Sequence, residues 1–313
     1  MSRRHLAVLV ALGCVWGASF LFIKVVVDET GPIELATGRI FFGAAALAPI
    51  VWRRGLRFSN PPLVLRRLLV LAVFSSAIPF VLISWAELHI DTGVASVLNS
   101  TMPLWTALFA SAFLPDEHLT LPTVLGLLVG FAGVAVLSGG DLASLRQEGL
   151  LSHMAVVGAA ACYGSGAVFA RARLQAEDRL TISAVQLAMA ALLLAPLSLA
   201  VDGLPVLNLS AKVWLAWLTL GAVNTGFATV VYYWLIQRVG SVRTSLVTYV
   251  IPTVGLLLGA AVLDEELGLN ALLGAALIVM GVATAAGGFR LSLLRRALPQ
   301  AAKVPLKPTR DGE

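Results

Sequence analysis

The sequence predicts an all-α integral membrane protein, in which ten transmembrane helices form two inverted five-helix repeats around a central cavity. Three observations predict this fold class. The composition suits lipid, with 58% apolar residues, 12% charged residues and a mean hydropathy of +0.90, whereas soluble domains are about a quarter charged. Ten apolar segments reach the roughly 20 residues that a membrane-spanning helix needs. The two halves of the chain also repeat one another.

The repeat consists of residues at a fixed spacing. Three residues of the first half recur 149 residues later, Trp85, Pro103 and Glu117 as Trp234, Pro252 and Glu266. Three glycines recur 148 residues later, Gly126, Gly133 and Gly140 as Gly274, Gly281 and Gly288. Each copy holds five apolar spans, an odd number, so the copies must enter the membrane from opposite sides. Inverted repeats of this kind are a transporter architecture, with the substrate site near the midplane.

The spans follow one another through short loops. In the first repeat, residues 5–140, we expect helices over 5–27, 32–52, 67–89, 92–113 and 119–139. In the second repeat, residues 151–289, we expect helices over 151–170, 180–201, 211–236, 242–263 and 268–289. The first span has no small-residue cleavage site, so we expect a retained helix rather than a signal peptide. Residues 290–313 form a basic, proline-containing tail that we expect to be cytoplasmic and disordered.

The distribution of lysine and arginine predicts the orientation. With the N-terminus in the cytoplasm, 18 of these residues fall on the inner side and three on the outer side, Lys24, Arg146 and Lys212. Cytoplasmic loops carry such an excess of positive charge. We therefore expect a multi-pass protein with both termini in the cytoplasm. One span more or fewer would reverse every later loop, so the asymmetry also supports an even number of spans.

Short motifs in both halves resemble a known family. They are Trp16-Gly17-Ala18-Ser19-Phe20 with Lys24, Arg39, Pro103 and Asp116-Glu117-His118-Leu119-Thr120 in the first half, and Tyr163-Gly164-Ser165, Pro252 and Glu265-Glu266-Leu267 in the second. Together they are similar to the EamA domains of the drug/metabolite transporter superfamily, over residues 5–289. The chain departs from the family's pattern at Tyr163, which replaces a tryptophan, and at Gln186, which replaces an arginine. The resemblance implies two EamA repeats and export of small metabolites, often amino acids, across the bacterial inner membrane.

Arg39 is the most informative single side chain. It lies about seven residues into its span, which is about 10 Å deep at 1.5 Å per residue. A charge at the centre of a membrane helix costs about 2.5–3.5 kcal/mol on insertion scales. Two interpretations are open. Arg39 binds a substrate carboxylate in a water-filled cavity, or it forms a structural ion pair with Glu34 or Glu87.

Aromatic and polar residues within the spans are further candidates for substrate binding. The aromatic ones are Trp16, Trp105, Tyr163, Tyr232 and Tyr249, and the polar ones are Ser84, Asn99, Gln186 and Asn224. Flat rings can hold an apolar or aromatic substrate, and the alternative for each ring is packing within the bundle. The polar groups either line a cavity or form hydrogen bonds between helices, at about 0.6 kcal/mol each.

Prolines within the spans are candidate hinges. Pro79, Pro103 and Pro252 each remove a backbone donor and tend to kink a helix. We expect them to act as hinges in alternating access, and the alternative is that they only shape a static cavity.

The fifth and tenth spans carry glycine ridges that let helices approach closely. We expect these spans to lie away from the substrate path, where they pack the scaffold or form a homodimer contact. Glu117 and Glu266 begin the same spans, and we expect them to cap these helices, because carboxylates are favourable at helix N-termini.

Several functions are disfavoured by what the spans lack. No span carries Asp or Glu at mid-depth, which argues against a proton relay and against a site for cationic drugs. The four histidines are scattered and no phosphate-binding loop is present, so we expect neither a metal nor a cofactor. A membrane hydrolase acting through Ser165 would lack a histidine at matching depth. The spans also contain no ring of charges of the kind that would indicate a channel.

The leading hypothesis is a secondary transporter that exports small amphipathic metabolites, hydrophobic or aromatic amino acids in particular, by alternating access. Its partners are the lipid bilayer and a small-molecule substrate, and no nucleic acid is expected. The alternative is a multidrug exporter of neutral or amphipathic compounds.

Overall fold

Every regular element in the described part of the chain is a helix. The computed structural model describes all residues except 57, 91, 118, 138–149, 255–268 and 286–313. The tail 290–313, Gly140, Gly288 and Glu266 therefore lie outside the described residues.

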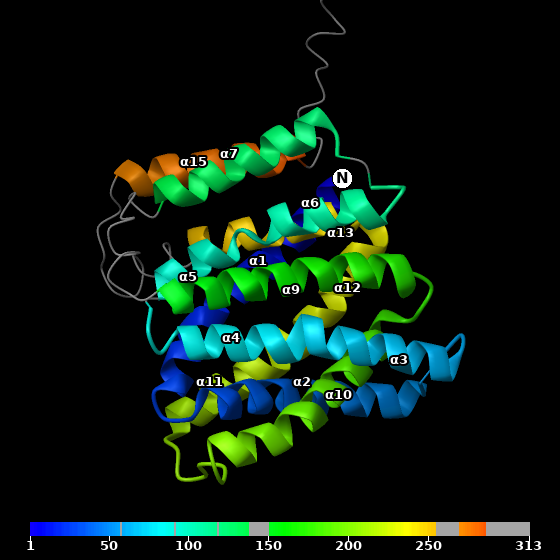
Figure 1. The fold of residues 1–313 in the computed structure, drawn as a ribbon, viewed down its shortest axis with the longest axis vertical. Coiled ribbons are helices and arrows are strands. Elements are labelled where there is room, and N and C mark those ends of the chain that lie inside the picture. Colours follow the sequence, from blue (N-terminus) through cyan, green and yellow to red (C-terminus); the bar gives the residue numbers. More distant parts are fainter. Residues whose placement is uncertain (57, 91, 118, 138–149, 255–268, 286–313) are drawn as a thin grey trace, which may run out of the picture.

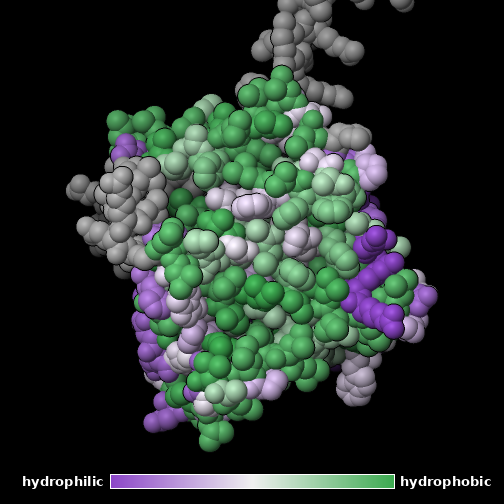
Figure 2. Space-filling model, in the orientation of Figure 1, coloured by the Kyte–Doolittle hydropathy of each residue, from purple (hydrophilic) through white to green (hydrophobic). Residues whose placement is uncertain are grey.

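Six helices or continuous helical runs are long and apolar enough to cross a membrane. They are α1 (Arg3–Val27), α2 (Pro32–Arg54), α3–η1–α4 (Pro61–Ala72, Val73–Ala77 and Ile78–Ala86), α9 (Leu150–Arg173), α10 (Arg179–Val201) and α11–η2–α12 (Ala211–Gly221, Ala222–Phe227 and Ala228–Val239). These confirm the first three expected spans of each half. The helices run side by side across the molecule (Figure 1). Apolar residues cover the face seen in Figure 2, and hydrophilic residues gather at the two edges where the helices end.

The remaining expected spans are shorter or broken in the described residues. The fourth consists of α5 (Thr92–Asn99) and α6 (Met102–Phe113), and the ninth of α13 (Ser241–Ser245) and, within the described residues, a helix over 247–254. The fifth and tenth are α7 (Leu121–Leu137) and α15 (Leu269–Ala285).

The break in the fourth span shows that Pro103 does not kink a helix, whereas its expected role as a hinge stays a prediction. Pro103 is the second residue of α6, a position in the first helical turn where the missing N–H costs nothing. It therefore begins a helix rather than kinking one. Pro252 lies inside the helix over 247–254 and leaves the Thr248 carbonyl, four residues earlier, without its usual donor. The Ser100 hydroxyl donates to that carbonyl at 3.1 Å, which joins the two broken spans across the repeats.

The third and eighth spans each contain a π-helical segment, η1 (Val73–Ala77) and η2 (Ala222–Phe227). Their first residues lie 149 positions apart, the spacing found in the sequence repeat. The extra residue in a π-turn changes the direction of the side chains that follow, and such segments are frequent at functional sites. Pro79 is the second residue of α4, directly after η1, where the π-turn ends.

The fifth and tenth spans pack against each other through their glycines. A Cβ at Gly281 would overlap the backbone of Gly130, and a Cβ at Gly126 would meet the Gly281 carbonyl and Ala285. The α7–α15 pair lies at one end of the molecule, and α2 and α10 lie at the other (Figure 1). The glycines are thus used within the chain, as the scaffold interpretation expects, and their faces are not available for the homodimer contact that the sequence suggested.

This packing predicts that Gly281→Ala destabilises the protein. The added methyl forces α15 away from the backbone of α7, and overpacking of this kind costs about 1–3 kcal/mol. Thermal unfolding in detergent measures the effect as a lower melting temperature. Gly158→Ala is the matched control, because the nearest atom to its Cβ is 3.9 Å away. If both variants melt alike, the close contact of the ridges does not hold the two helices together.

Candidate functional site

A central cavity lies between the two repeats. It contains about 770 Å³ of space not filled by protein atoms, including the part that opens to the outside. Its walls come from α1, α2, η1, α4, α5, α6, α9, α10, η2, α12 and the helix over 247–254. No described residue of α7 or α15 lines it, in agreement with their expected place away from the substrate path.

Arg39 is the only ionisable group of fixed charge among the described lining residues, which include no Asp or Glu. Its side chain is 6% exposed. Its Nε donates to Thr225 Oγ1 at 3.2 Å, and its guanidinium carbon lies 4.0 Å from the centre of the Phe80 ring. The two terminal amino groups make no hydrogen bond to the described residues. They remain available to a ligand in the cavity.

The π-helix η2 prepares the acceptor for Arg39. The Thr225 hydroxyl donates its proton to the Leu220 carbonyl, five residues earlier, at 2.8 Å. Its oxygen is therefore free to accept from Arg39 Nε. The arginine is thus positioned by a side chain from the other repeat, 186 residues away.

The alternative interpretation of Arg39 is an ion pair with Glu34 or Glu87. No carboxylate in the described ranges lies within 4.0 Å of its guanidinium. Glu34 Oε1 instead accepts from the backbone N–H of Val206 at 2.8 Å. Glu87 is buried and stabilises the charge of Arg39 from a distance, so the direct contacts of this charge are the Phe80 ring and a single hydroxyl. Such a charge is costly unless something else pairs with it.

Aromatic rings form one wall of the cavity. Trp16 packs against Tyr232 with ring centres 5.2 Å apart, and Tyr163 packs against Phe80 at 6.1 Å. Trp16 Nε1 also donates to the Asn224 carbonyl at 2.9 Å, which fixes the plane of the indole. These rings give a ligand flat apolar surfaces next to the Arg39 guanidinium.

The polar lining residues divide into satisfied and unsatisfied groups. Asn224 Nδ2 donates to Ser19 Oγ at 3.0 Å, and Gln186 Oε1 accepts from the Tyr233 hydroxyl at 2.7 Å. Both amides thus form the interhelical hydrogen bonds that were one of their two interpretations, and both also line the cavity. Asn99 differs, because it is 5% exposed and its Oδ1 has no hydrogen-bond partner in the part of the chain that the structure describes. A buried acceptor left unpaired costs about 1–3 kcal/mol, which a ligand could recover.

Seven of the ten candidate residues therefore lie together around the cavity: Trp16, Arg39, Asn99, Tyr163, Gln186, Asn224 and Tyr232. The other three do not line it. Tyr249 donates its hydroxyl to the Leu127 carbonyl at 2.9 Å and packs on Gly130 of α7. Trp105 stacks on Phe109, and Ser84 is fully buried in α4.

Sequence reasoning missed several lining residues, above all Phe80. Nothing in the sequence marks Phe80, because one more phenylalanine in an apolar span carries no signal. Ser75 and Ser19 could have been found, since each is a polar residue inside a span.

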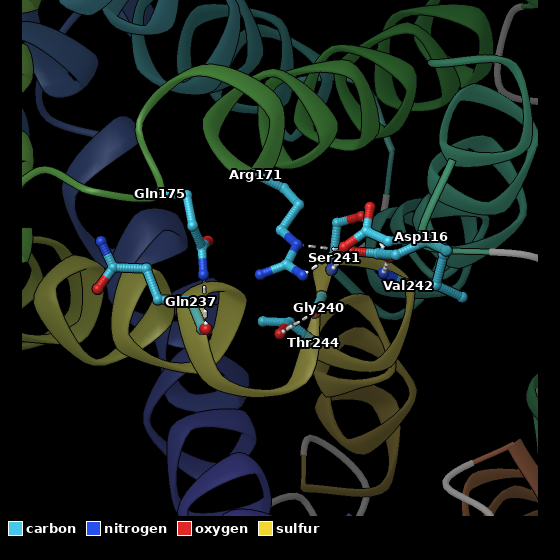
Figure 3. A network of polar contacts seen from close by, with 9 residues as sticks. Asp116, Arg171, Gln175, Gln237, Gly240, Ser241, Val242 and Thr244 are labelled. Atoms are coloured by element: carbon cyan, nitrogen blue, oxygen red, sulfur yellow. Dashed lines mark hydrogen bonds and ion pairs between the residues drawn. The ribbon is translucent and has the colours of Figure 1, made fainter. Parts of the chain in front are cut away.

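A polar network at one end of the bundle, which we call the latch, joins Asp116, Glu117, Arg171, Ser241 and Val242 (Figure 3). Glu117 accepts from the backbone N–H groups of Ser241 and Val242, at 2.8 and 3.0 Å, and from the Ser241 hydroxyl at 2.8 Å. Arg171 lies 3.3 Å from Glu117 and 2.6 Å from Asp116. The network ties the end of α6 to α9 and to the start of α13.

The latch corrects the expectation for Glu117. This residue was expected to cap its own span, but its carboxylate binds the N-terminus of α13 in the other repeat. The chain turns into α13 at Gly240, which has a φ of +90°, a conformation that suits glycine. A Cβ there would also lie 2.7 Å from Glu117 Oε1, so the turn brings the free N–H groups of α13 directly onto the carboxylate.

Helices span the membrane and surround an internal cavity, and one charge in that cavity has no direct ion pair to a described residue. These are the features of a membrane transport protein. The chain belongs to the EamA-like transporter family, whose model matches residues 5–139 and 150–286.

Similar proteins agree with this assignment. An uncharacterized transporter of Bacillus subtilis, YoaV, is 24% identical over 274 residues, which cover 88% of this chain and 94% of that protein. A protein of Streptantibioticus cattleyicolor named as a probable terminal-alkyne amino-acid exporter is 27% identical over 277 residues, 85% of this chain and 88% of that one. A protein crystal structure with 22% identity superposes with a TM-score of 0.73, over 95% of this chain and all of that one. It has the same fold.

Proposed function

We propose that this protein is a secondary transporter that exports small amphipathic metabolites with a carboxylate, most directly hydrophobic or aromatic amino acids, across the bacterial inner membrane. The observation that carries the proposal is Arg39. It is a buried guanidinium with no described carboxylate within 4.0 Å, in a cavity lined by aromatic rings and by no described carboxylate. A substrate carboxylate supplies a counter-charge in direct contact.

Each part of such a substrate has a proposed partner in the cavity. The planar guanidinium holds a carboxylate through two parallel hydrogen bonds. The side chain of the substrate lies against the rings of Trp16, Tyr163 and Tyr232. The amino group needs an acceptor in the same cavity, and the unpartnered Asn99 Oδ1 offers one. The exporter from Streptantibioticus cattleyicolor, whose printed name includes an amino acid, supports this substrate class.

Alternating access is the proposed mechanism. The two repeats, residues 5–140 and 151–289, rock against each other around the cavity. The latch lies at the end of the bundle where α9 and α12 finish with Arg171, Arg173 and Arg238. The excess of positive charge at this end supports a cytoplasmic location for it and for both termini. The latch then closes the cytoplasmic side and must open for the substrate to enter. Pro79, Pro103 and Pro252 are the proposed hinges.

The alternative is an exporter of neutral amphipathic compounds. The aromatic and apolar part of the lining favours it, because rings such as Trp16 and Tyr232 bind many flat molecules. This alternative function leaves the charge of Arg39 without a ligand. The two functions differ in whether transport requires a carboxylate.

Transport by purified protein in liposomes tests the proposal. Vesicles loaded with unlabelled phenylalanine should take up labelled phenylalanine by exchange, with saturation, and phenethylamine should not compete. Empty liposomes and the Arg39→Gln variant are the controls. Exchange that phenethylamine inhibits as well as phenylalanine does would favour the alternative. Absence of saturable exchange across the hydrophobic and aromatic amino acids would overturn the proposal.

A further inference from the structure

A second cavity lies outside the central one, in a groove between α3, α6 and α9 that we call the side groove. It encloses about 1660 Å³ of unfilled space, including the part open to the surroundings. Along most of its length it is apolar, with Phe74, Phe109, Phe113 and Phe169 among its walls. Phe113 is 70% exposed and Phe74 is 42% exposed, so the groove opens onto the lipid-facing surface of the helices.

The side groove becomes polar at one end only. Arg171 and Arg173 line that end, one turn of α9 beyond Phe169. Arg67 lies at the same rim, because its guanidinium donates to the Arg173 carbonyl at 2.9 Å. The polar end is thus at the end of the helices, where the headgroups of a bilayer lie, and the phenylalanines are at the depth of the acyl chains.

The charge at the rim is mainly positive and partly unpaired. Arg171 is engaged by Asp116 and Glu117. No carboxylate of the described residues lies within 4.0 Å of Arg67 or Arg173. The Arg173 side chain therefore lines the polar end of the groove without a direct ion pair to a described residue, and the Arg67 guanidinium lies beside it, at the Arg173 carbonyl.

We propose that the side groove is a binding site for an anionic phospholipid, with the phosphate at Arg67 and Arg173 and an acyl chain along the phenylalanines. Charge complementarity selects an anionic lipid over a zwitterionic one, because basic pockets between membrane helices bind anionic headgroups. The apolar length of the groove selects a lipid over a free phosphate, since each buried CH₂ group of a chain adds about 0.8 kcal/mol to binding. Asp116 lies at the same rim and disfavours an anion close to it, which places the phosphate on the Arg173 side.

The site is independent of the proposed substrate. It lies next to the latch, however, because Arg171 and Asp116 belong to both. A bound headgroup adds a negative charge beside Arg171, so the lipid composition of the membrane acts on the ion pairs that hold the latch closed.

Lipid binding to the purified full-length protein in detergent tests the proposal. We would measure binding of a fluorescent phosphatidylglycerol, in competition with unlabelled phosphatidylglycerol, phosphatidylcholine and inorganic phosphate. The variant is the double substitution Arg67→Gln and Arg173→Gln. The matched control is Arg53→Gln and Arg54→Gln, which removes the same charge at the end of α2, outside the groove.

The expected result is that phosphatidylglycerol competes at least tenfold better than phosphatidylcholine, and that the groove variant binds about fivefold more weakly for each arginine removed. The control pair should bind as the wild type does. Equal competition by phosphatidylcholine, full competition by inorganic phosphate, or equal loss in both pairs of variants would each overturn the proposal. If the groove variant fails to fold, the comparison of the three competitors on the wild-type protein still tests the proposal.

Discussion

Replacing Arg39 by glutamine removes amino-acid binding while the protein still folds. Loss of one partner of a buried, hydrogen-bonded charge pair costs about 2–5 kcal/mol, so the affinity should fall at least about thirtyfold. The fold should tolerate the change, because Arg39 makes one hydrogen bond, to Thr225, and no ion pair with a described residue. The substitution weakens the long-range interaction of Arg39 with the buried Glu87, but it breaks no direct ion pair with a described residue.

The measurement is the thermal shift caused by ligands, since a ligand that binds the folded state alone raises the apparent melting temperature. Phenylalanine should stabilise the wild type, phenethylamine should not, and Arg39→Gln should show neither shift. Arg39→Lys keeps the charge but loses the planar fork, so we expect it to retain a weaker shift. If Arg39→Gln shifts as the wild type does, the carboxylate does not bind at Arg39 and the substrate class is reopened.

Replacing Glu117 by glutamine should open the latch. The carboxylate accepts three hydrogen bonds at the start of α13 and pairs with Arg171. A neutral amide has one acceptor oxygen, so it cannot keep both sets of contacts. Hydrogen bonds to a charged group contribute about 1.5–3 kcal/mol, and we expect the variant to lose that much stability in the state with the latch closed.

Labelling of a buried position next to the latch measures this opening. Thr244 is fully buried in α13, and Thr244→Cys can be introduced after the two free cysteines, Cys14 and Cys162, are replaced by alanine. A water-soluble maleimide should label it at least about tenfold faster with Glu117→Gln, because about 1.4 kcal/mol is a factor of ten in a population.

Asp116→Asn is the matched control for the latch. Asp116 contacts the same arginine, but its side chain is 58% exposed, against 11% for Glu117. An exposed ion pair contributes about 0–1 kcal/mol, so this variant should label at nearly the wild-type rate. Equal rates in both variants would mean that the latch does not control access to this end of the bundle.

The local physics of the chain explains how much of the fold was predictable. Hydropathy placed α1, α2, α9 and α10 to within a few residues, because a span must bury about 20 apolar residues wherever it lies. It did not reveal the break before Pro103 or the π-helices η1 and η2, since a change of hydrogen-bond register leaves the composition of a segment unchanged. The sequence repeat of 149 residues predicted that the two segments occupy equivalent positions in the two halves. It did not predict that both are π-helical.

The candidate site was predicted in its residue types rather than in its contacts. An arginine deep in an apolar span required an explanation from the sequence alone, and so did the polar amides within the spans, Asn99, Gln186 and Asn224. The groups that surround Arg39 are Thr225 of η2 and Phe80 of α4, and only the tertiary structure identified them. Tyr249 was a plausible lining residue by depth, and only the position of α7 shows that its hydroxyl faces the scaffold instead.

The sequence by itself determined that this protein is a helical membrane protein of the EamA-like transporter family, built from two repeats with one arginine deep in a span. These properties depend on the order of residues along the chain. The tertiary structure alone decided that Arg39 donates to Thr225, that Glu117 caps a helix of the other repeat, and that the α7 and α15 glycines face each other. The physical reason is that each of these contacts joins residues more than a hundred positions apart, and a side chain's partner is set by how the helices pack.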